Sequence, residues 1–129
     1  MPVTYSIDVS ERLIRTRCAG NVTVSEVLEH FQTLVADSLL TDHPDVLLDV
    51  RETTSLPDRN QLAAVTYALG QVGEKVKFKL CAIVAASDAM YGMQRMFEVM
   101  AQPHFQQICV FREIAEAETW LLAQRHLDG

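Results

Sequence analysis

The sequence contains no long hydrophobic run. Its longest uninterrupted apolar stretch is seven residues, Leu80 to Ala86, whereas a membrane-spanning helix needs about 20. The first residues also lack a basic segment followed by an apolar run, the pattern of a secretory signal. We therefore expect no membrane span, no secretory signal and a cytoplasmic protein.

Basic residues and cysteines are scarce as well. Eleven lysines and arginines stand against 17 acidic residues, giving a formal charge of -6, which is the wrong sign for a nucleic-acid partner. The odd number and wide spacing of Cys18, Cys81 and Cys109 predict buried free thiols rather than disulfides. The four histidines lack the short spacing of metal ligands. We expect no metal and no cofactor.

What the sequence does contain is typical of one globular domain. The chain has 129 residues, of which 49% are hydrophobic and 22% are charged. This length fits a single hydrophobic core, and the composition argues against collagen-like, disordered and coiled-coil proteins. We therefore expect a single domain that spans residues 1–129.

The hydrophobic pattern alternates between strand and helix periods. Period-2 alternation predicts a hairpin of two strands over 3–9 and 13–18, and Thr23 with Glu26 forms a capping box before the first helix. Further strands are predicted over 46–50, 80–86 and 108–111, and helices over 24–35, 62–72, 88–100 and 113–125. The second helix is predicted to stop at Gly70 and Gly73. This order predicts an α/β fold: a five-stranded mixed, mainly parallel sheet with an N-terminal β-hairpin and four helices on both faces.

Several segments resemble one known family. They are Gly20–Thr23 (Gly-Asn-Val-Thr), Leu48–Arg51 (Leu-Asp-Val-Arg), Tyr91–Glu98 (Tyr-Gly-Met-Gln-Arg-Met-Phe-Glu), Val110–Arg112 and Ala117–Leu121. Together they resemble the SpoIIAA-like family of the STAS superfamily (sulfate transporter and anti-sigma-factor antagonist). The resemblance covers nearly the whole chain. It implies a fold similar to that of the CRAL-TRIO lipid-transfer domains.

The resemblance also raises the question of whether this chain is phosphorylated. Anti-sigma-factor antagonists carry a phosphorylated serine in an Asp-Ser-Ser-Gly-like motif, at the start of the helix after the second buried strand. The corresponding positions here, residues 57–60, contain no serine. Thr53, Thr54 and Ser55 lie slightly earlier, so their phosphorylation stays open, but a phosphoswitch is disfavoured.

Polar residues cluster where the parallel strands are expected to end. Open α/β sheets bind ligands at the carboxyl ends of their strands, and we expect Asp49, Arg51, Ser55, Ser87 and Asp88 to gather there. The structural alternative is an Asp49–Arg51 ion pair, because an unpaired carboxylate in an apolar strand is costly. The carboxylates argue against a phosphate ligand.

A methionine-rich stripe occupies the third predicted helix. Met90, Met93 and Phe97, with Met96 and Met100, recur at helical spacing. They are expected either to pack on the sheet or to line a pocket for an apolar ligand, because methionine adapts its shape easily. Gly92 in this helix predicts a close approach by a neighbouring element.

No catalytic motif is found in the chain. His104 is the nearest candidate base, but no serine or cysteine lies in a nucleophile motif. We therefore expect a non-enzymatic STAS-like binding or regulatory module that acts through a protein partner or a small apolar ligand, and a homodimer through the exposed hairpin edge is open. One alternative is a lipid or hydrophobic-ligand carrier, which requires an apolar cavity of roughly several hundred Å³. The other is an enzyme with a strand-end site around Asp49.

Overall fold

The computed structural model describes residues 2–128, with side chains through Arg125, so the side chain of His126 lies outside the described residues. The elements follow the predicted order: β1 (Val3–Asp8), β2 (Leu13–Gly20), α1 (Val24–Val35), β3 (Asp45–Thr53), α2 (Arg59–Val72), β4 (Leu80–Val84), α3 (Asp88–Ala101), a 3-10 helix η1 (Gln102–His104), β5 (Gln107–Phe111) and α4 (Ile114–Asp128). The predicted α/β fold with one hairpin is confirmed.

The five strands form one sheet in the order β1-β2-β3-β4-β5. β1 and β2 are antiparallel, with Val3 opposite Cys18 and Asp8 opposite Leu13, and the other neighbouring pairs are parallel. Strand order therefore equals chain order, and β1 and β5 are the two edges. Right-handed crossovers that advance steadily along a sheet place their helices on one face.

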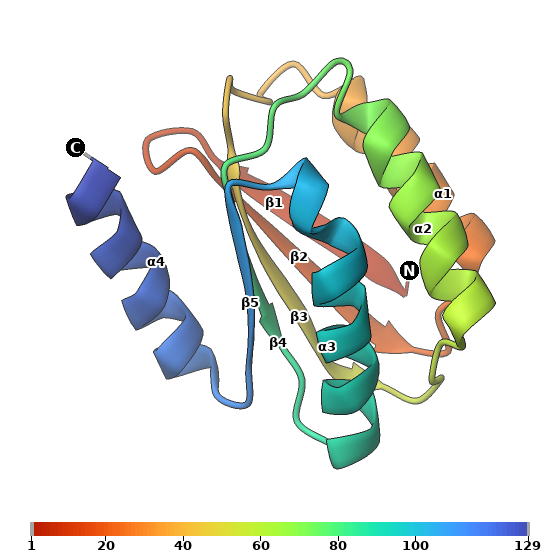
Figure 1. Ribbon diagram of the computed structural model, residues 1–129. Coiled ribbons are helices and arrows are strands. Elements are labelled where there is room, and N and C mark those ends of the chain that lie inside the picture. The colour runs from red at the N-terminus through yellow and green to blue at the C-terminus, as the bar shows by residue number, and fades with distance from the viewer. Residues whose placement is uncertain (1, 129) are drawn as a thin grey trace.

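The helices are distributed unequally over the two faces (Figure 1). α1, α2 and α3 lie on one face, where they share a hydrophobic core with the sheet. α4 follows the last strand, and it packs alone on the other face over β4 and β5. The α4 face of β1 and β2 is consequently exposed at Thr4, Ser6, Arg15 and Arg17.

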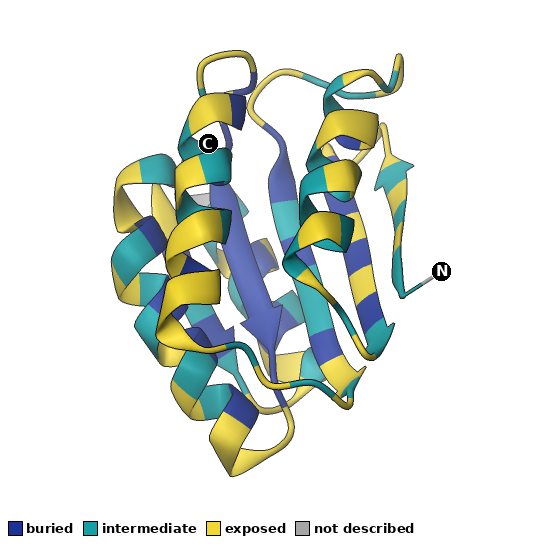
Figure 2. Cartoon of the chain, turned by 90° about the vertical axis from the view of Figure 1, so that its right-hand side faces the viewer, coloured by how far each residue is buried: buried dark blue, intermediate teal, exposed yellow. Residues whose placement is uncertain are grey.

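Burial follows this layering (Figure 2). β2 alternates, with Ile14, Thr16 and Cys18 buried toward α1–α3 while Arg15 and Arg17 are exposed. β4 lies between two helical layers, and all five of its residues are buried. This is the reason for its continuous apolar run, because a strand covered on both faces has no solvent side.

Side-chain caps fix the helix starts. The predicted capping box of Thr23 and Glu26 is present at α1. A second box, formed by Asp58 and Gln61, starts α2 at Arg59, three residues earlier than the apolar spacing indicates. Ser87 caps α3 by accepting a hydrogen bond from the Met90 amide. Each box satisfies backbone amides that have no partner inside the helix.

Two expectations about glycines were wrong. Gly70 does not stop α2, which runs on to Val72 and is capped by Gly73. Instead, a Cβ on Gly70 would lie 3.0 Å from the His104 ring, so close packing explains this glycine. Gly92, where a close approach was expected, is exposed and faces open space.

The C-terminal helix is joined to the sheet by a buried ion pair. Arg125 donates from Nε to Oδ2 of Asp45 at 2.8 Å, and its Nη1 contacts a carboxylate oxygen of Glu11 at 2.7 Å. Asp45 is 4% exposed and also accepts a hydrogen bond from the Leu80 amide. A buried carboxylate needs such partners, so α4 is held in register with the start of β3.

Candidate ligand-binding cavity

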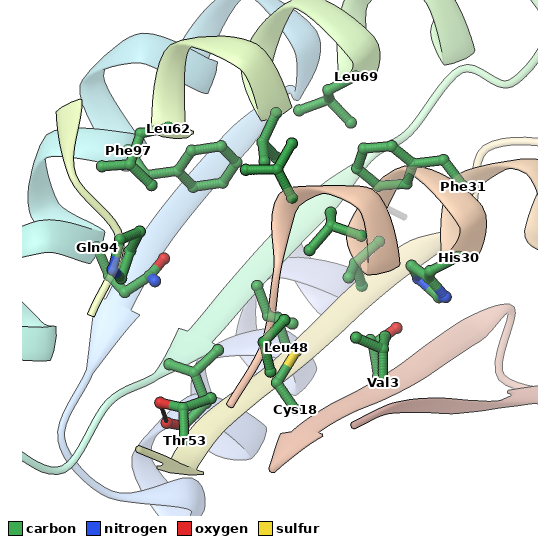
Figure 3. A pocket seen from close by; sticks show the side chains of 18 of the residues that line it. Val3, Cys18, His30, Phe31, Leu48, Thr53, Leu62, Leu69, Gln94 and Phe97 are labelled. Atoms are coloured by element: carbon green, nitrogen blue, oxygen red, sulfur yellow. Dashed lines mark hydrogen bonds between the residues drawn. The ribbon is translucent and has the colours of Figure 1, made fainter. Parts of the chain in front are cut away.

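A cavity of about 170 Å³ lies between the sheet and the layer formed by α1, α2 and α3. Figure 3 shows Leu48 and Cys18 from the sheet below it, with Phe31, Leu62 and Phe97 from the three helices around it. Protein cores are normally packed without voids larger than a water molecule. An apolar space of this size in the main core is therefore a candidate ligand site.

The floor of the cavity is the central strand β3. Val46 and Leu48 point toward α1–α3 and line the cavity, yet both are only partly buried. By contrast, Ile83 of the adjacent strand β4 points toward the same helices and is fully enclosed. The helical layer thus closes over Ile83 and leaves space over β3.

Two loops meet at one end of the cavity. The backbone amide of Val22 donates to Oγ of Ser55 at 2.9 Å, and this hydroxyl donates to the Val22 carbonyl oxygen at 3.3 Å. Both residues line the cavity. Ser55 thus fastens the loop after β3 to the loop after β2, at the carboxyl ends of these parallel strands.

Two buried polar side chains in the cavity wall lack strong partners. Thr16 of β2 is 5% exposed, and its hydroxyl makes no hydrogen bond with the described residues. Gln94 of α3 is 6% exposed, and its carboxamide makes one contact, from Nε2 to the Met90 sulfur at 3.4 Å. Because neither polar group is fully enclosed, both have capacity for a ligand or water in the cavity.

His30 and Cys18 are two further polar residues of the wall. The His30 ring packs edge-on against Tyr5 at 5.2 Å between ring centres, and burial lowers its pKa. Burial, with a smaller effect from the charge of Asp49, raises the pKa of the Cys18 thiol to about 11. Both groups are therefore neutral at neutral pH, His30 as imidazole and Cys18 as thiol.

The residues predicted to form one site are divided between two faces of the sheet. Ser55, Met90 and Phe97 line the cavity. Met93 packs against the same core from a half-buried position, without lining the cavity.

Asp49 and Arg51 lie on the opposite face, because they alternate with the cavity-facing Leu48 and Val50 of β3. Arg51 donates to both oxygens of Asp49, from Nε at 2.9 Å and from Nη2 at 2.8 Å, which confirms the expected pair. These hydrogen bonds lower the pKa of Asp49. With both carboxylate oxygens bonded to Arg51 on the face away from the cavity, the pair has the properties of a structural ion pair.

Ser87 and Asp88 already have hydrogen-bond or ion-pair partners at the start of α3. Ser87 is the cap, and Asp88 forms an ion pair with Arg112 at 3.0 Å. Neither lines the cavity. The strand-end residues are therefore not brought together around a common space.

Sequence reasoning singled out only Ser55, Met90 and Phe97 among the cavity residues, and those it missed include Thr16, His30, Leu48 and Gln94. A signal was present for two of them. Thr16 lies between Ile14 and Cys18 on the apolar face of its strand, and Gln94 lies between Met90 and Phe97 on the apolar face of its helix. A polar residue at a core position is an indication of function or of a buried network.

Other kinds of site were also sought among the described residues. No group of three or more His, Cys, Asp or Glu side chains has the arrangement to hold a metal ion there. No helix in residues 2–128 is both long and apolar enough to cross a membrane. Cys18 and Cys81 are buried and Cys109 is half-buried, and all three are free.

Comparisons with known proteins give a structural likeness. No protein-family model matches the chain. No curated protein matches it either. Among solved structures, it is similar to an uncharacterized protein of the DUF3478 family with a SpoIIAA-like fold from Shewanella loihica PV-4. The two share 16% sequence identity, with a TM-score of 0.61 over 92% of this chain and 93% of the other. The chain therefore has a SpoIIAA-like fold, as its sequence resemblance predicts.

Proposed function

We propose that the chain is a non-enzymatic cytoplasmic binding module of the STAS type, which holds a small apolar ligand between β3 and the layer of α1–α3. The observation that carries this proposal is the cavity of about 170 Å³ in the main hydrophobic core. Its walls are mostly aliphatic and aromatic, with a few polar groups, which is the usual composition of ligand pockets. Three unpaired cysteines accord with a reducing compartment.

The size of the cavity sets the size of the ligand. An apolar cavity of about 150 Å³ accommodates benzene in an engineered protein. A molecule with one ring or a short chain therefore fits the space, whereas a lipid carrier requires roughly several hundred Å³. We accordingly favour a small-molecule binding module over the lipid-carrier alternative.

The test uses benzene and a substitution that fills the cavity. A ligand that binds only the folded state raises the melting temperature with increasing ligand concentration. We expect this rise for the wild type. We expect none for Leu48→Phe, because the larger side chain occupies the space above β3. Calorimetry across a benzene series measures both.

Val99→Phe is the matched control. Val99 is 66% exposed on α3 and does not line the cavity, so this variant adds an aromatic ring without filling it. Its melting temperature is expected to rise with benzene as in the wild type. A wild-type protein that is unaffected by saturating benzene would contradict the proposal.

A regulatory role through a protein partner is the second candidate, favoured by the uncovered part of the sheet. β1 and β2 expose Ser6, Arg15 and Arg17 on the face that α4 leaves open. Arg15 and Arg17 already pair with Glu118 and Glu52, so this polar surface suits transient binding. Such binding predicts a complex that Arg17→Glu weakens and high salt dissolves.

A further inference from the structure

The charge of the cavity wall is the first evidence on ligand chemistry. None of the 27 described residues that line the cavity is Lys, Arg, Asp or Glu. His30 is the one ionisable nitrogen base among them, and burial keeps it neutral. An ion that entered this space would lose its hydration without gaining a counter-charge, which is strongly unfavourable. The wall thus rejects carboxylates, phosphates and amines.

The position of Gln94 is the second evidence. It lies on the buried side of α3 between Met90 and Phe97, where an apolar side chain would pack without leaving polar atoms unpaired. Its carboxamide has only the 3.4 Å contact with the Met90 sulfur, and its oxygen accepts no hydrogen bond from the described residues. Figure 3 shows the carboxamide directed toward the cavity.

The carboxamide also determines which groups it can bind. It offers an N–H donor and a carbonyl acceptor, so it pairs equally well with a hydroxyl, a carbonyl or an N–H group. His30 lies at the far side of the cavity from Gln94, with Leu48 and Cys18 between them (Figure 3). The apolar body of a ligand therefore fits over β3 with one end near α3.

We propose that the cavity selects an uncharged small molecule with a hydrogen-bonding group on an apolar ring or short chain, and that Gln94 is the residue that recognises this group. This inference rests on the proposed function, since it assigns the chemistry of the same cavity. It makes Gln94 a specificity-determining residue, whose effect is on which ligand binds and not on whether the cavity exists.

Three benzene derivatives test the inference: phenol, toluene and benzoate. They share one ring and differ in a hydroxyl, a methyl or a carboxylate group. Dissociation constants are measured by NMR titration for the wild type and for Gln94→Leu. We expect both phenol and toluene to bind the wild type, and benzoate not to bind at concentrations that saturate with phenol.

The effect of Gln94 is measured as the ratio of the affinity for phenol to the affinity for toluene. In Gln94→Leu the affinity for phenol relative to toluene is expected to fall about 3- to 10-fold, the effect of one hydrogen bond. Toluene binding, which is retained, reports that the cavity is intact. Gln94→Met is the second variant, because its unbranched side chain matches glutamine in shape. Gln71→Leu on the exposed side of α2 is the control and leaves the ratio unchanged.

The outcomes separate the two proposals. If phenol and toluene bind but their ratio is the same in both Gln94 variants, the role of Gln94 is wrong and the binding function stands. Benzoate that binds as tightly as phenol overturns the selection for uncharged ligands. If neither phenol nor toluene binds the wild type, the proposed function itself fails.

Discussion

The two faces of the sheet are packed differently. On the α4 face, Leu47, Leu80 and Val84 are almost completely buried against Ala117 and Leu121, in a small cluster outside the cavity. On the other face three helices cover a larger core, and a space remains over β3. More covering helices therefore did not produce closer packing. Three helices leave gaps where they meet. Two polar residues, Thr16 of β2 and Gln94 of α3, lie in the core between the sheet and these helices.

Adjacent leucines of β3 provide the largest expected contrast. Leu47 is 2% exposed in the α4 cluster, whereas Leu48 is partly buried and borders the cavity. Leu47→Ala is expected to lower the free energy of unfolding by about 3 kcal/mol, because it removes packed atoms and leaves a void. Leu48→Ala should cost about 1 kcal/mol, since part of its surface already lacks neighbours. Urea denaturation measures both, and equal losses would contradict the difference between the faces.

A smaller effect is expected from the pH dependence of His30. Burial lowers its pKa in the folded protein below that of the unfolded chain, so the unfolded state binds the proton first as the pH falls. The stabilising contribution is complete above the unfolded pKa of about 6.5 and is lost as the pH falls through the folded pKa.

Replacement of His30 tests this contribution. His30→Phe should reduce the loss of stability between pH 7 and pH 5, measured by denaturation at each pH. Val99→Phe, on the exposed side of α3, is the control, because it adds the same ring without removing a histidine, and it should retain the wild-type slope. A His30→Phe protein with an unchanged slope would show that the cavity wall does not hold a neutral imidazole.

The smallest effect is expected for the Asp49–Arg51 pair on the α4 face. Arg51 lowers the pKa of Asp49, so the pair stabilises the fold above the unfolded pKa of Asp, about 3.9, and this contribution is lost as the pH falls through the folded pKa. The Arg51 side chain is 36% exposed, and such pairs contribute about 1 kcal/mol or less. Arg51→Ala should raise the pKa of Asp49 in an NMR titration, with little change in stability at pH 7. Arg59→Ala should leave that pKa unchanged.

Much of the fold was predictable because it depends on local patterns. Alternation in β1 and β2, the capping box at Thr23 and the apolar run of β4 each specify an element by neighbours in the chain. The Asp49–Arg51 pair was predictable for the same reason, since residues two apart on a strand share a face. Gly92 was misjudged because a glycine in a helix does not reveal what lies opposite it, and the structure places open space there.

The candidate site was only partly predictable. The methionine stripe correctly indicated Met90 and Phe97 as residues facing the interior, and Ser55 was placed at the strand ends. The strand-end rule also grouped Asp49 with Ser55, although alternation places Asp49 on the other face of β3 from the cavity. The rule describes one edge of the sheet but does not choose between its faces.

The sequence by itself determined the order of the elements, their caps and the apolar faces that they present, because these depend on residues within a few positions of each other. Only the tertiary structure decided where the helical layer leaves a space. A cavity depends on how α1, α2 and α3 fit together over β3, which side-chain periodicity does not encode. The role of Gln94 likewise depends on the tertiary structure. In the sequence it is one polar residue in an apolar stripe. In the fold it is a carboxamide without a strong partner in the wall of a cavity.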